Sequence, residues 1–501
     1  MADYFQLLSA LAVVFLALYY YFTSYFDFWK VRNVPGPRPQ PVWGNMKDSI
    51  FRKKFIGSVI TEFYEEYKNE PMVGIFSARK PTLILRDLDL IKDVLIKDFS
   101  TFDERGITVH EKTEPLSQNL FSLDAKRWRP MRTRLSPVFT SGKLKEMFHL
   151  IVECSGQLEK YLEQVAEKGE PVDCRDIASK FTTDVIGSCA FGINMNALSE
   201  EENEFRRVGK KVFTPELPQF IRQTIKDSFP HLYSLLGHVL PVTETTAFFT
   251  KVITETIEYR KKKNIFRPDF VNMLITLKDN PEKLEDVELT DTMIAAQAFV
   301  FFVAGFETSS TTIGHALYEM ALNPELQDKL REEIRACSAK TNGDLKYETV
   351  KEMKYLDKVF KETLRMYPPV TVIRRKCNKN YTFNGTKVSI LKGMSVLIPA
   401  YAIQRDSSIY PNPDIFDPER FSEEAEAARH PMSFLPFGDG PRNCIGARFA
   451  VFQTKVGLIK MLENFRVDVC EKTMIPYVQN PRSFVLSPKD GVYLKISKVK
   501  N

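Results

Sequence analysis

An uncharged apolar run near the N-terminus constrains the fold more than any other feature of the sequence. The stretch from Tyr4 to Phe26 carries no charge over roughly 23 positions, which is enough to cross a bilayer as a helix. A cleaved signal peptide is the alternative, but such signals start with basic residues and end at a small-residue cleavage site. This run starts after Asp3 and ends in aromatic residues, so we expect a retained membrane anchor over residues 1–28.

The residues after this run predict how the remaining chain is oriented. Lys30 and Arg32 follow the anchor, and the positive-inside tendency then places the rest of the chain in the cytosol. Residues 34–44 contain four alternating prolines, which prevent a helix and favour a stiff spacer. We expect a basic, proline-rich hinge over residues 29–44, either as a plain linker or as a rigid strut that sets how the body sits on the membrane.

The remaining residues, 45–501, have the composition of one large globular domain. Hydrophobic residues make up 44% of the chain and charged residues 27%, and no Pro/Gly/Ser-rich linker divides this range. Apolar residues at helical spacing predict long helices, and short alternating stretches predict a few strands. The predicted helices cover 143–168, 284–317, 323–340 and 348–366, and the predicted strands cover 81–87, 394–401 and 492–496. We therefore expect a mainly α fold with small β-sheets.

Charge and cysteine usage exclude several classes of function. The net charge of +6 is too weak to indicate a nucleic-acid partner. The seven cysteines are odd in number and widely spaced, without a C-x-x-C pair, and no H-E-x-x-H sequence occurs. A disulfide framework, a structural zinc site and a zinc-protease site are therefore not expected.

One cysteine lies in an unusually stiff segment, "FLPFGDGPRNCIGARFA", residues 434–450. A lone thiolate suits a metal that another group already holds, such as the iron of a haem. The glycines allow backbone N–H groups to approach the sulfur, and Arg442 offers a cation to a haem carboxylate. The helical pattern after Gly446 would present a helix N-terminus to the thiolate of Cys444. An inert buried thiol is the usual alternative for an isolated cysteine.

The spacing Phe437-x-x-Gly440-x-Arg442-x-Cys444-x-Gly446 resembles the haem-binding signature of the cytochrome P450 monooxygenases. This resemblance covers essentially the whole chain and implies a cytochrome P450-type haem domain with haem b. It implies Cys444 as the axial ligand of the iron, with Phe437 packed beside the sulfur. Gly438, Arg442 and Gly446 are further cofactor-binding residues in this reading.

A second matching segment is the apolar stretch 295–317, which contains Ala304-Gly305-x-Glu307-Thr308. Glycine inside a helix suggests a group packed close to its backbone, and the Thr308 hydroxyl can bond to the carbonyl of Ala304 and bend or open the helix. A plain core helix is the alternative. The family resemblance implies that Ala304 and Gly305 contact the haem, and that Thr308 and Glu307 are catalytic and organise proton delivery to bound O2.

Two weaker motifs support the same family. Glu362 and Arg365 in "KETLRMYPP" lie on one helix face, and "PERF" supplies Arg420; the resemblance implies a structural lock beneath the haem. For Trp128 and Arg132 in "KRWRPMR" the resemblance implies contact with a haem propionate. Arg375 is the expected second propionate partner, although the adjacent Arg374 is the alternative.

Apolar residues near these motifs predict a pocket for a small lipophilic substrate, with ordinary core packing as the alternative for each. The expected lining residues are Phe299, Phe302, Val370, Val372 and Ile373. The family resemblance implies that Phe121 and Phe484 complete the pocket. The anchor and the two main motifs are most similar to those of insect microsomal members, which often oxidise plant toxins, insecticides or endogenous lipophiles.

The resemblance also implies partners and a location. No flavin or nicotinamide domain is recognisable in the chain, so NADPH would act indirectly through a membrane-bound NADPH–cytochrome reductase, with cytochrome b5 as a second donor, at the cytosolic face of the endoplasmic reticulum. The expected docking cations are Lys126, Arg127, Arg134, Lys143 and Lys145. An enzyme that rearranges peroxides without a reductase, and a haem carrier or sensor, are the competing functions.

Overall fold

Segments that are distant in sequence come together in the structure. The computed structural model describes residues 2–199, 203–228, 230–236, 243–267, 269–280 and 288–499. Contacts divide the chain into two units, each built from three pieces of sequence. Unit 1 contains Met1–Gly106, Val370–Pro413 and Arg429–Asn443, and unit 2 contains Ile107–Pro369, Asp414–Ala428 and Cys444–Asn501.

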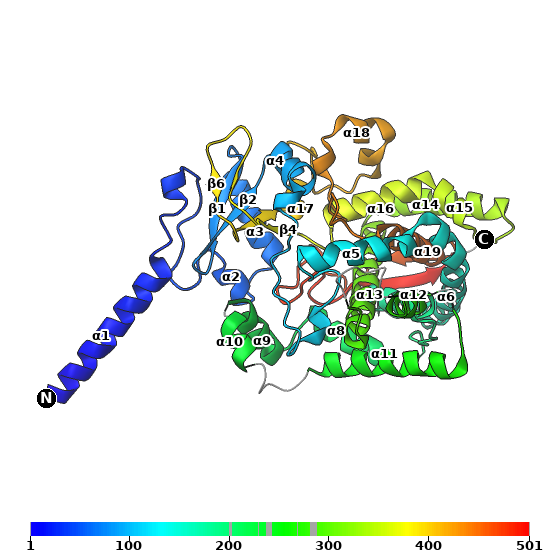
Figure 1. The fold of residues 1–501 in the computed structure, drawn as a ribbon. Helices are drawn as coiled ribbons and strands as arrows, with labels where there is room; N and C mark the ends of the chain where they lie inside the picture. Colours follow the sequence, from blue (N-terminus) through cyan, green and yellow to red (C-terminus); the bar gives the residue numbers. More distant parts are fainter. Residues whose placement is uncertain are drawn as a thin grey trace. The chain divides into compact units, whose positions relative to one another are not determined.

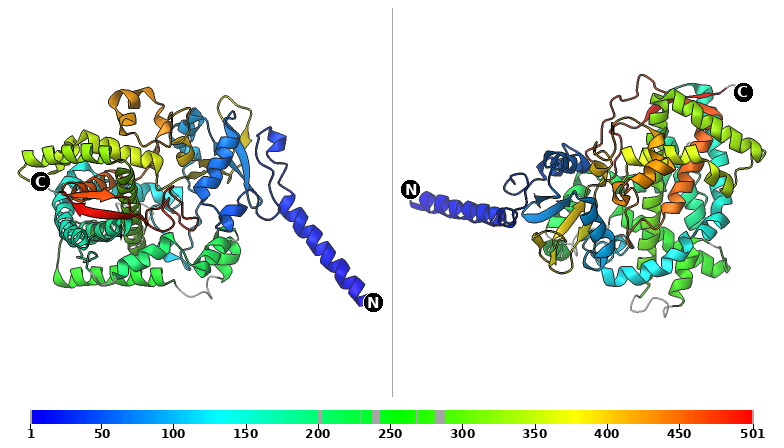
Figure 2. Two further views of the ribbon diagram at one scale, coloured as in Figure 1. Left: turned by 180° about the vertical axis from the view of Figure 1, so that it is seen from behind. Right: turned by 90° about the horizontal axis from the view of Figure 1, so that it is seen from above.

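Unit 1 is organised around a four-stranded sheet with the order β1-β2-β7-β4. Strands β1 and β2 form an antiparallel hairpin, β7 joins β2 in parallel, and β4 pairs with β7 antiparallel. The blue and yellow strands of Figures 1 and 2 show how the early and late segments share this sheet. The helical elements of unit 1 are α1 (Ala2–Thr23), η1 (Lys30–Arg32), α2 (Lys47–Ile50), α3 (Ile56–Glu66), α4 (Leu88–Lys92), η2 (Asp93–Lys97), η3 (Phe99–Thr101), α17 (Ala400–Ile403) and η9 (Pro431–Ser433). Its strands are β1 (Met72–Ser77), β2 (Lys80–Leu85), β4 (Ile373–Lys376), β5 (Tyr381–Thr382), β6 (Ser389–Ile390) and β7 (Ser395–Ile398).

Unit 2 is a helical body with one three-stranded sheet of order β3-β9-β8. Its helical elements up to α11 are η4 (Pro115–Ser117), α5 (Ala125–Leu135), η5 (Ser136–Phe139), α6 (Ser141–Lys168), α7 (Cys174–Ile186), η6 (Gly187–Phe191), α8 (Glu204–Phe213), α9 (Leu217–Ser228), α10 (Pro230–Leu236) and α11 (Glu244–Lys263). The later ones are α12 (Phe270–Lys278), α13 (Asp291–Leu322), α14 (Pro324–Lys340), α15 (Tyr347–Glu352), α16 (Lys354–Met366), η8 (Pro418–Phe421), α18 (Glu423–Ala428) and α19 (Ala447–Leu462). The strands are β3 (Val172–Asp173), β8 (Phe465–Asp468) and β9 (Tyr493–Lys498).

The long helix α13 forms the centre of unit 2. Its N-terminus is capped by the Thr290 hydroxyl, which accepts from the Met293 N–H, and it ends just before Pro324 because proline disfavours a helical residue ahead of it. Helix α7 packs along α13 more extensively than any other element does, and α11 and α19 also pack on it. Most of α13 is buried, which explains why it is apolar around its whole circumference.

The mainly helical fold with small sheets confirms the sequence-based expectation. The predicted segments 143–168 and 323–340 correspond to α6 and α14, and the three predicted strands correspond to β2, β7 and β9. The prediction of one helix over 348–366 is wrong, because Met353 adopts an extended backbone (φ −70°, ψ 91°) and separates α15 from α16. Within the predicted helix 284–317, residues 284–287 lie outside the described residues, and α13 begins at Asp291.

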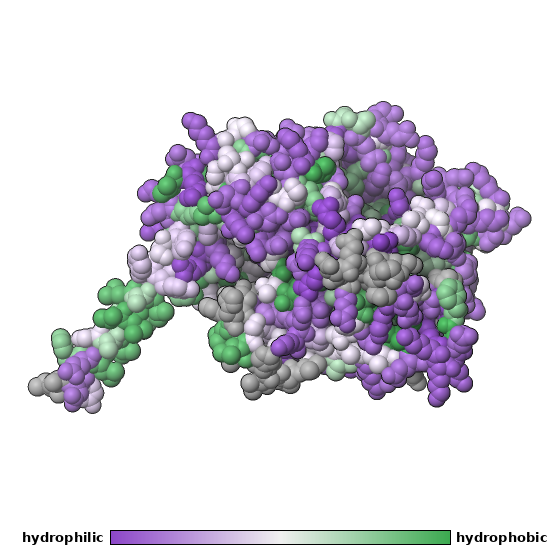
Figure 3. Space-filling view, viewed as in Figure 1, coloured by the Kyte–Doolittle hydropathy of each residue, from purple (hydrophilic) through white to green (hydrophobic). Residues whose placement is uncertain are grey.

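Helix α1 is apolar and exposed along its length. Two described helices, Asp3–Thr23 and Asp291–Leu322, are long and apolar enough to cross a bilayer, but the second is mostly buried in protein. Figure 3 shows α1 as a largely hydrophobic rod. An exposed surface of this kind is unfavourable in water, so α1 fits the expected anchor, and the boundaries 1–28, 29–44 and 45–501 stay a prediction.

Candidate functional site

The segment before the candidate ligand cysteine folds as consecutive tight turns within unit 1. The Gly438 N–H donates to the Leu435 carbonyl (3.0 Å), and both Gly438 and Gly440 have left-handed backbones, with φ +67° and +72°. A Cβ on Gly440 would lie 1.9 Å from the carbonyl oxygen of Leu95, so no other residue fits there. Phe437 is half-buried in this loop.

Unit 1 also buries two arginine side chains, Arg375 on β4 and Arg442 in this loop, each 2% exposed. Burial, with the nearby charge of Arg442, lowers the pKa of Arg375 to about 10. The Arg375 Nη1 donates to the Arg374 carbonyl (3.0 Å), and its Nε has no hydrogen-bond partner among the described residues. Arg374 lies on the exposed face of β4 and donates to the Ser395 hydroxyl (3.0 and 3.2 Å). Two buried cations that interact with each other favour a nearby anion. The choice of Arg375 over Arg374 as its partner stays a prediction.

Cys444 is exposed and lies three residues before the first residue of α19 in unit 2. The N-terminus of a helix favours a nearby thiolate. Burial lowers the pKa of Arg132, and an electrostatic interaction with Cys444 opposes that shift. Trp128, one turn earlier on α5, is buried. Gly446 makes no close approach, since a Cβ there would meet no described atom within 4 Å.

The Ala304–Thr308 stretch lies in the middle of α13. The Thr308 hydroxyl donates to the Ala304 carbonyl (2.7 Å), as expected, but α13 continues as a helix without interruption. Ala304 is exposed, and Gly305 and Thr308 are half-exposed, on a helix that is otherwise mostly buried. A Cβ on Gly305 would lie 2.3 Å from the Cδ1 of Ile186, so the group packed against this glycine is a side chain of α7.

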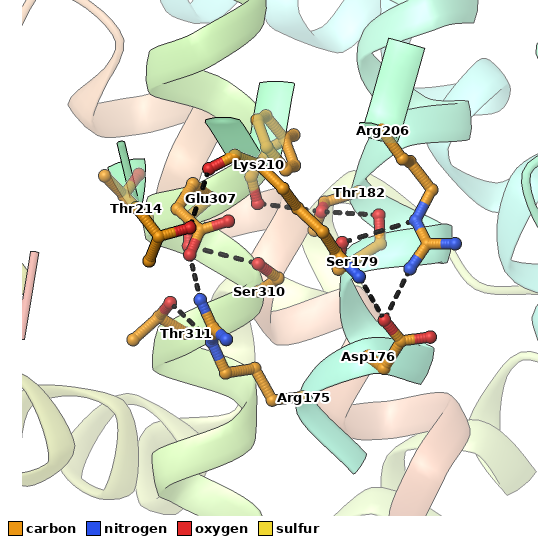
Figure 4. Close-up of polar contacts among 12 residues, drawn as sticks. Arg175, Asp176, Ser179, Thr182, Arg206, Lys210, Thr214, Glu307, Ser310 and Thr311 are labelled. Carbon is orange, nitrogen blue, oxygen red and sulfur yellow. Dashed lines mark hydrogen bonds and ion pairs between the residues drawn. The ribbon is translucent and has the colours of Figure 1, made fainter. Parts of the chain in front are cut away.

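Glu307 points away from solvent and pairs with a residue that the sequence did not suggest. Its side chain is 3% exposed and forms an ion pair with Arg175, near the start of α7. The Arg175 Nε also donates to the Thr311 hydroxyl (3.2 Å). Figure 4 shows Arg175 reaching from α7 to α13. Sequence spacing carries no signal for this pair because the two residues are 132 positions apart.

The same close-up contains a second charged cluster that sequence reasoning missed. Asp176 accepts hydrogen bonds from Arg206 (2.6 Å) and Lys210 (2.7 Å), both on α8. Burial opposes the ionised form, but the two cations lower the pKa of Asp176. The Thr182 hydroxyl donates to the Phe306 carbonyl (2.8 Å). These contacts tie α7 to both α8 and α13 at the level of the Ala304–Thr308 stretch.

The predicted structural residues meet in unit 2. Glu362 and Arg365 on α16 are fully buried and form two hydrogen bonds (2.7 and 2.8 Å). Arg420 of η8 lies 3.5 Å from the same carboxylate, and the Asp417 N–H donates to it (2.9 Å). Burial raises the pKa of Glu362, and both arginines work against that rise. The cluster joins α16 to η8.

The predicted pocket residues differ in exposure. In unit 2, Phe121 is 49% and Phe484 60% exposed, whereas Phe302 is completely buried. The Phe302 ring packs against Phe306 (5.1 Å between centroids) and Phe249 (5.4 Å), which favours the core-packing alternative for this residue.

Three further predicted pocket residues belong to unit 1, and one to unit 2. In unit 1, Val370 is 45% exposed, while Ile373 and Val372 pack with the sheet core. In unit 2, the Phe299 ring contacts Phe249 (5.1 Å). Val370 is therefore the unit 1 candidate best placed to meet a ligand.

Most of the predicted docking cations already have acidic neighbours. Arg127 pairs with Asp124 (2.7 Å) and Glu111, Lys143 with Glu146 (2.6 Å), and Lys145 with Glu348. Acidic neighbours reduce the positive field that such a patch would present to an acidic partner, so docking at these residues stays a prediction.

The donor set fits a cysteine-ligated haem better than a bare metal ion. Among the described residues, no group of three or more His, Cys, Asp or Glu side chains could hold a metal ion, and none of the seven cysteines forms a disulfide. In unit 2 the exposed thiol of Cys444 before α19 offers a single soft ligand, and in unit 1, described by itself, the buried Arg375 and Arg442 offer charge to carboxylates. These are the groups that a haem with propionates requires.

Comparison with known proteins identifies the family. A family model described as "Cytochrome P450" matches residues 34–495. The chain is 42% identical to "Cytochrome P450 6a2" of Drosophila melanogaster, over 99% of this chain and 100% of the relative. It is 41% identical to "Cytochrome P450 6a8" of Drosophila melanogaster (98% and 99%) and 41% identical to "Cytochrome P450 6A1" of Musca domestica (99% and 98%). The chain therefore belongs to the cytochrome P450 family and is a P450 monooxygenase.

Proposed function

We propose that this P450 inserts one oxygen atom from O2 into a small lipophilic substrate, with electrons from a membrane-bound NADPH–cytochrome reductase. The observation that carries this proposal is the exposed thiol of Cys444, three residues before α19. The similarity of the motifs to those of insect microsomal members is the basis for proposing a plant toxin, an insecticide or an endogenous lipophile as the substrate class.

Cys444 is proposed as the axial ligand of the haem iron. A thiolate-ligated haem supplies the O–O bond cleavage on which the reaction depends. The N-terminal end of α19 stabilises the sulfur as a thiolate, while the turns at Gly438 and Gly440 hold the preceding loop. Phe437 and Gly446 flank the ligand in sequence and are proposed to contact the cofactor.

Four cationic or polar side chains are proposed to hold the haem propionates. Arg375 and Arg442 are buried and raise each other's electrostatic energy, and an anionic carboxylate would relieve that repulsion. Trp128 and Arg132 on α5 are proposed for the other propionate, since the N–H groups of both side chains are hydrogen-bond donors.

Thr308 and Glu307 are proposed to hold and move protons on the oxygen side. The Thr308 hydroxyl is half-exposed and donates to the Ala304 carbonyl, so it can accept a hydrogen bond from water at that surface. Glu307 is held by Arg175 and therefore acts from a fixed position on α13. Ala304 and Gly305 provide the small surface next to this hydroxyl.

The substrate pocket is proposed to use the exposed apolar residues of the predicted set. Phe121, Val370 and Phe484 are each 45% exposed or more, and aromatic and aliphatic surfaces of this kind favour flat, lipophilic molecules. Phe299 in unit 2, and Val372 and Ile373 in unit 1, remain predicted lining residues.

A location at the endoplasmic reticulum membrane is proposed for this enzyme. Helix α1 is long, apolar and exposed, and Lys30 and Arg32 follow it, which supports a cytosolic catalytic body. The reductase, and cytochrome b5 as a second donor, would meet it there.

The test uses the full-length protein in microsomes or nanodiscs. Cys444→Ser should abolish the carbon monoxide difference spectrum typical of thiolate-ligated haem and all reductase-dependent turnover. Cys337→Ser, which alters a half-exposed thiol on α14, is the matched control and should change neither. A thiolate spectrum that survives in Cys444→Ser would refute the ligand assignment, and wild-type turnover without reductase or NADPH would refute the reaction class.

A further inference from the structure

The C-terminal end of the anchor is fixed to the first hairpin of unit 1. Trp29 is 3% exposed, and its indole N–H donates to the Ile75 carbonyl on β1 (2.9 Å). A Cβ on Gly74 would lie 2.4 Å from the Trp29 ring, and the Phe26 ring packs on Phe76 (5.2 Å between centroids). This packing precedes the proline-rich segment, so the direction of the anchor is set before the prolines begin.

The turn of the same hairpin contacts the anchor through a cation. Arg79 lies between β1 and β2, and its guanidinium carbon is 3.8 Å from the Tyr21 ring centroid and 4.8 Å from that of Tyr25. Both tyrosine rings are about half exposed. Arginine over an aromatic face is a favourable contact that leaves N–H groups at the guanidinium edge for other acceptors.

These contacts fix the level of the turn relative to the bilayer. Helix α1 has 22 residues, which is about 33 Å at the rise of an α-helix, and the hydrocarbon core is about 30 Å thick. The tyrosines at the C-terminal end of α1 therefore lie at the headgroup level, where such side chains concentrate. Because Arg79 touches Tyr21, the turn lies at that level too.

The residues around the turn have the composition of a surface that binds anionic lipids. Between Asp27 and Lys54 the chain has seven Lys or Arg residues and only two acidic ones. The pairing of Gly44 with Ser77 holds this segment beside the end of β1. Val42 and Phe51 are 37% and 50% exposed. Basic residues mixed with exposed apolar side chains are typical of peripheral membrane contacts.

We propose that the β1–β2 turn and residues 27–54 form a juxtamembrane surface that binds the phosphate groups of anionic phospholipids beside the anchor. The inference rests on the membrane anchoring proposed above. Arg79 and Lys80 provide the phosphate contacts at the turn, and Trp29 packed on Gly74 keeps that turn in register with the end of α1. Unit 1 is thereby attached to the bilayer at two points, the anchor and the β1–β2 turn, which fixes the tilt of its sheet relative to the membrane.

The test measures hydrogen–deuterium exchange of the turn in the full-length, haem-loaded protein. The protein is placed in nanodiscs of phosphatidylcholine alone or of phosphatidylcholine with phosphatidylserine. The amides around residues 77–80 should exchange more slowly with phosphatidylserine, and 1 M salt, where the Debye length is about 3 Å, should remove that protection.

Two variants separate the turn from general charge effects. Each cation near an anionic surface strengthens attachment by about fivefold, so Arg79→Ala with Lys80→Ala should weaken the attachment of the turn by about 25-fold and abolish its protection. Lys68→Ala is the matched control. Lys68 is exposed and precedes β1, at the far end of the hairpin, about 20 Å from the turn, so protection should persist.

The outcomes distinguish this surface from the anchor itself. Retention of the double variant in the membrane after alkaline carbonate extraction, with its haem spectrum intact, shows that the anchor and the fold are unaffected. Equal exchange of the turn in both kinds of nanodisc would overturn the proposal. Protection that appears only when reductase is added would also overturn it, because the turn would then bind a protein. Release of the wild-type chain by carbonate would instead refute the anchoring.

Discussion

Arg175→Met tests how Glu307 is held on the central helix. The Glu307 carboxylate is 3% exposed and its ion-pair partner Arg175 is 23% exposed. Methionine keeps an unbranched apolar side chain but removes the guanidinium, and with it the bond to Thr311. A buried carboxylate then remains without its counter-charge.

The size of the effect follows from this burial. Removing one partner of a buried ion pair costs about 3–5 kcal/mol, and the partial exposure of Arg175 places the expected loss at about 3 kcal/mol. Glu307→Gln leaves the Arg175 guanidinium unpaired but still in contact with solvent. We therefore expect the free energy of unfolding to fall by only about 1 kcal/mol. The double variant has no buried charge left without a partner and should lose only about 2 kcal/mol, which gives a coupling of about 2 kcal/mol between the two residues.

Urea unfolding of the four haem-loaded proteins in one detergent measures this coupling, from shifts in midpoint at a common slope. The control cycle uses Lys354 and Glu423, a pair with side chains 81% and 87% exposed, which should show almost no coupling. Single effects of Arg175→Met and Glu307→Gln that add within about 0.5 kcal/mol would refute the reasoning, because the pair would then not act as a unit. With coupling present, Arg175→Met should also divert NADPH consumption away from product.

Further predictions concern other parts of the chain. Gly440→Ala places a Cβ 1.9 Å from the Leu95 carbonyl at φ +72° and should lower the unfolding free energy by more than about 2 kcal/mol; a wild-type urea midpoint would contradict this. Arg365→Met removes the ion-pair partner of the fully buried Glu362 and should lower the free energy of unfolding by about 3–5 kcal/mol. The expected result is a large fall in the yield of haem-loaded protein. Burial opposes the charged form of Asp176, but its two cationic partners lower its pKa. The ionised carboxylate therefore stabilises the fold above the unfolded pKa of about 4, and this stabilisation is lost as the pH falls below that value. Asp176→Asn should therefore lower stability at neutral pH but have a smaller effect in acid, as shown by thermal midpoints measured across pH.

The helices were predictable where apolar residues repeat at helical spacing over many turns, as in α6, α13 and α14. The break at Met353 was not, because no proline or glycine marks it in the sequence. The assignment of Cys444 as the ligand stays a prediction, and it rests on a segment in which Gly438 and Gly440 adopt backbones that other residues avoid, which makes its spacing distinctive.

By itself the sequence determined the family and the mainly helical fold, because the motifs and the apolar periodicity that indicate them lie in contiguous residues with local physical constraints. Only the tertiary structure decided which partners distant residues acquire. Arg374 and Arg375 must lie on opposite faces of β4 because side chains alternate along a strand, but the burial of Arg375 depends on what covers that face. Glu307 likewise gains Arg175, and Gly305 meets Ile186, because α7 packs along α13. Packing of this kind joins residues more than a hundred positions apart, and their spacing in the chain carries no trace of it.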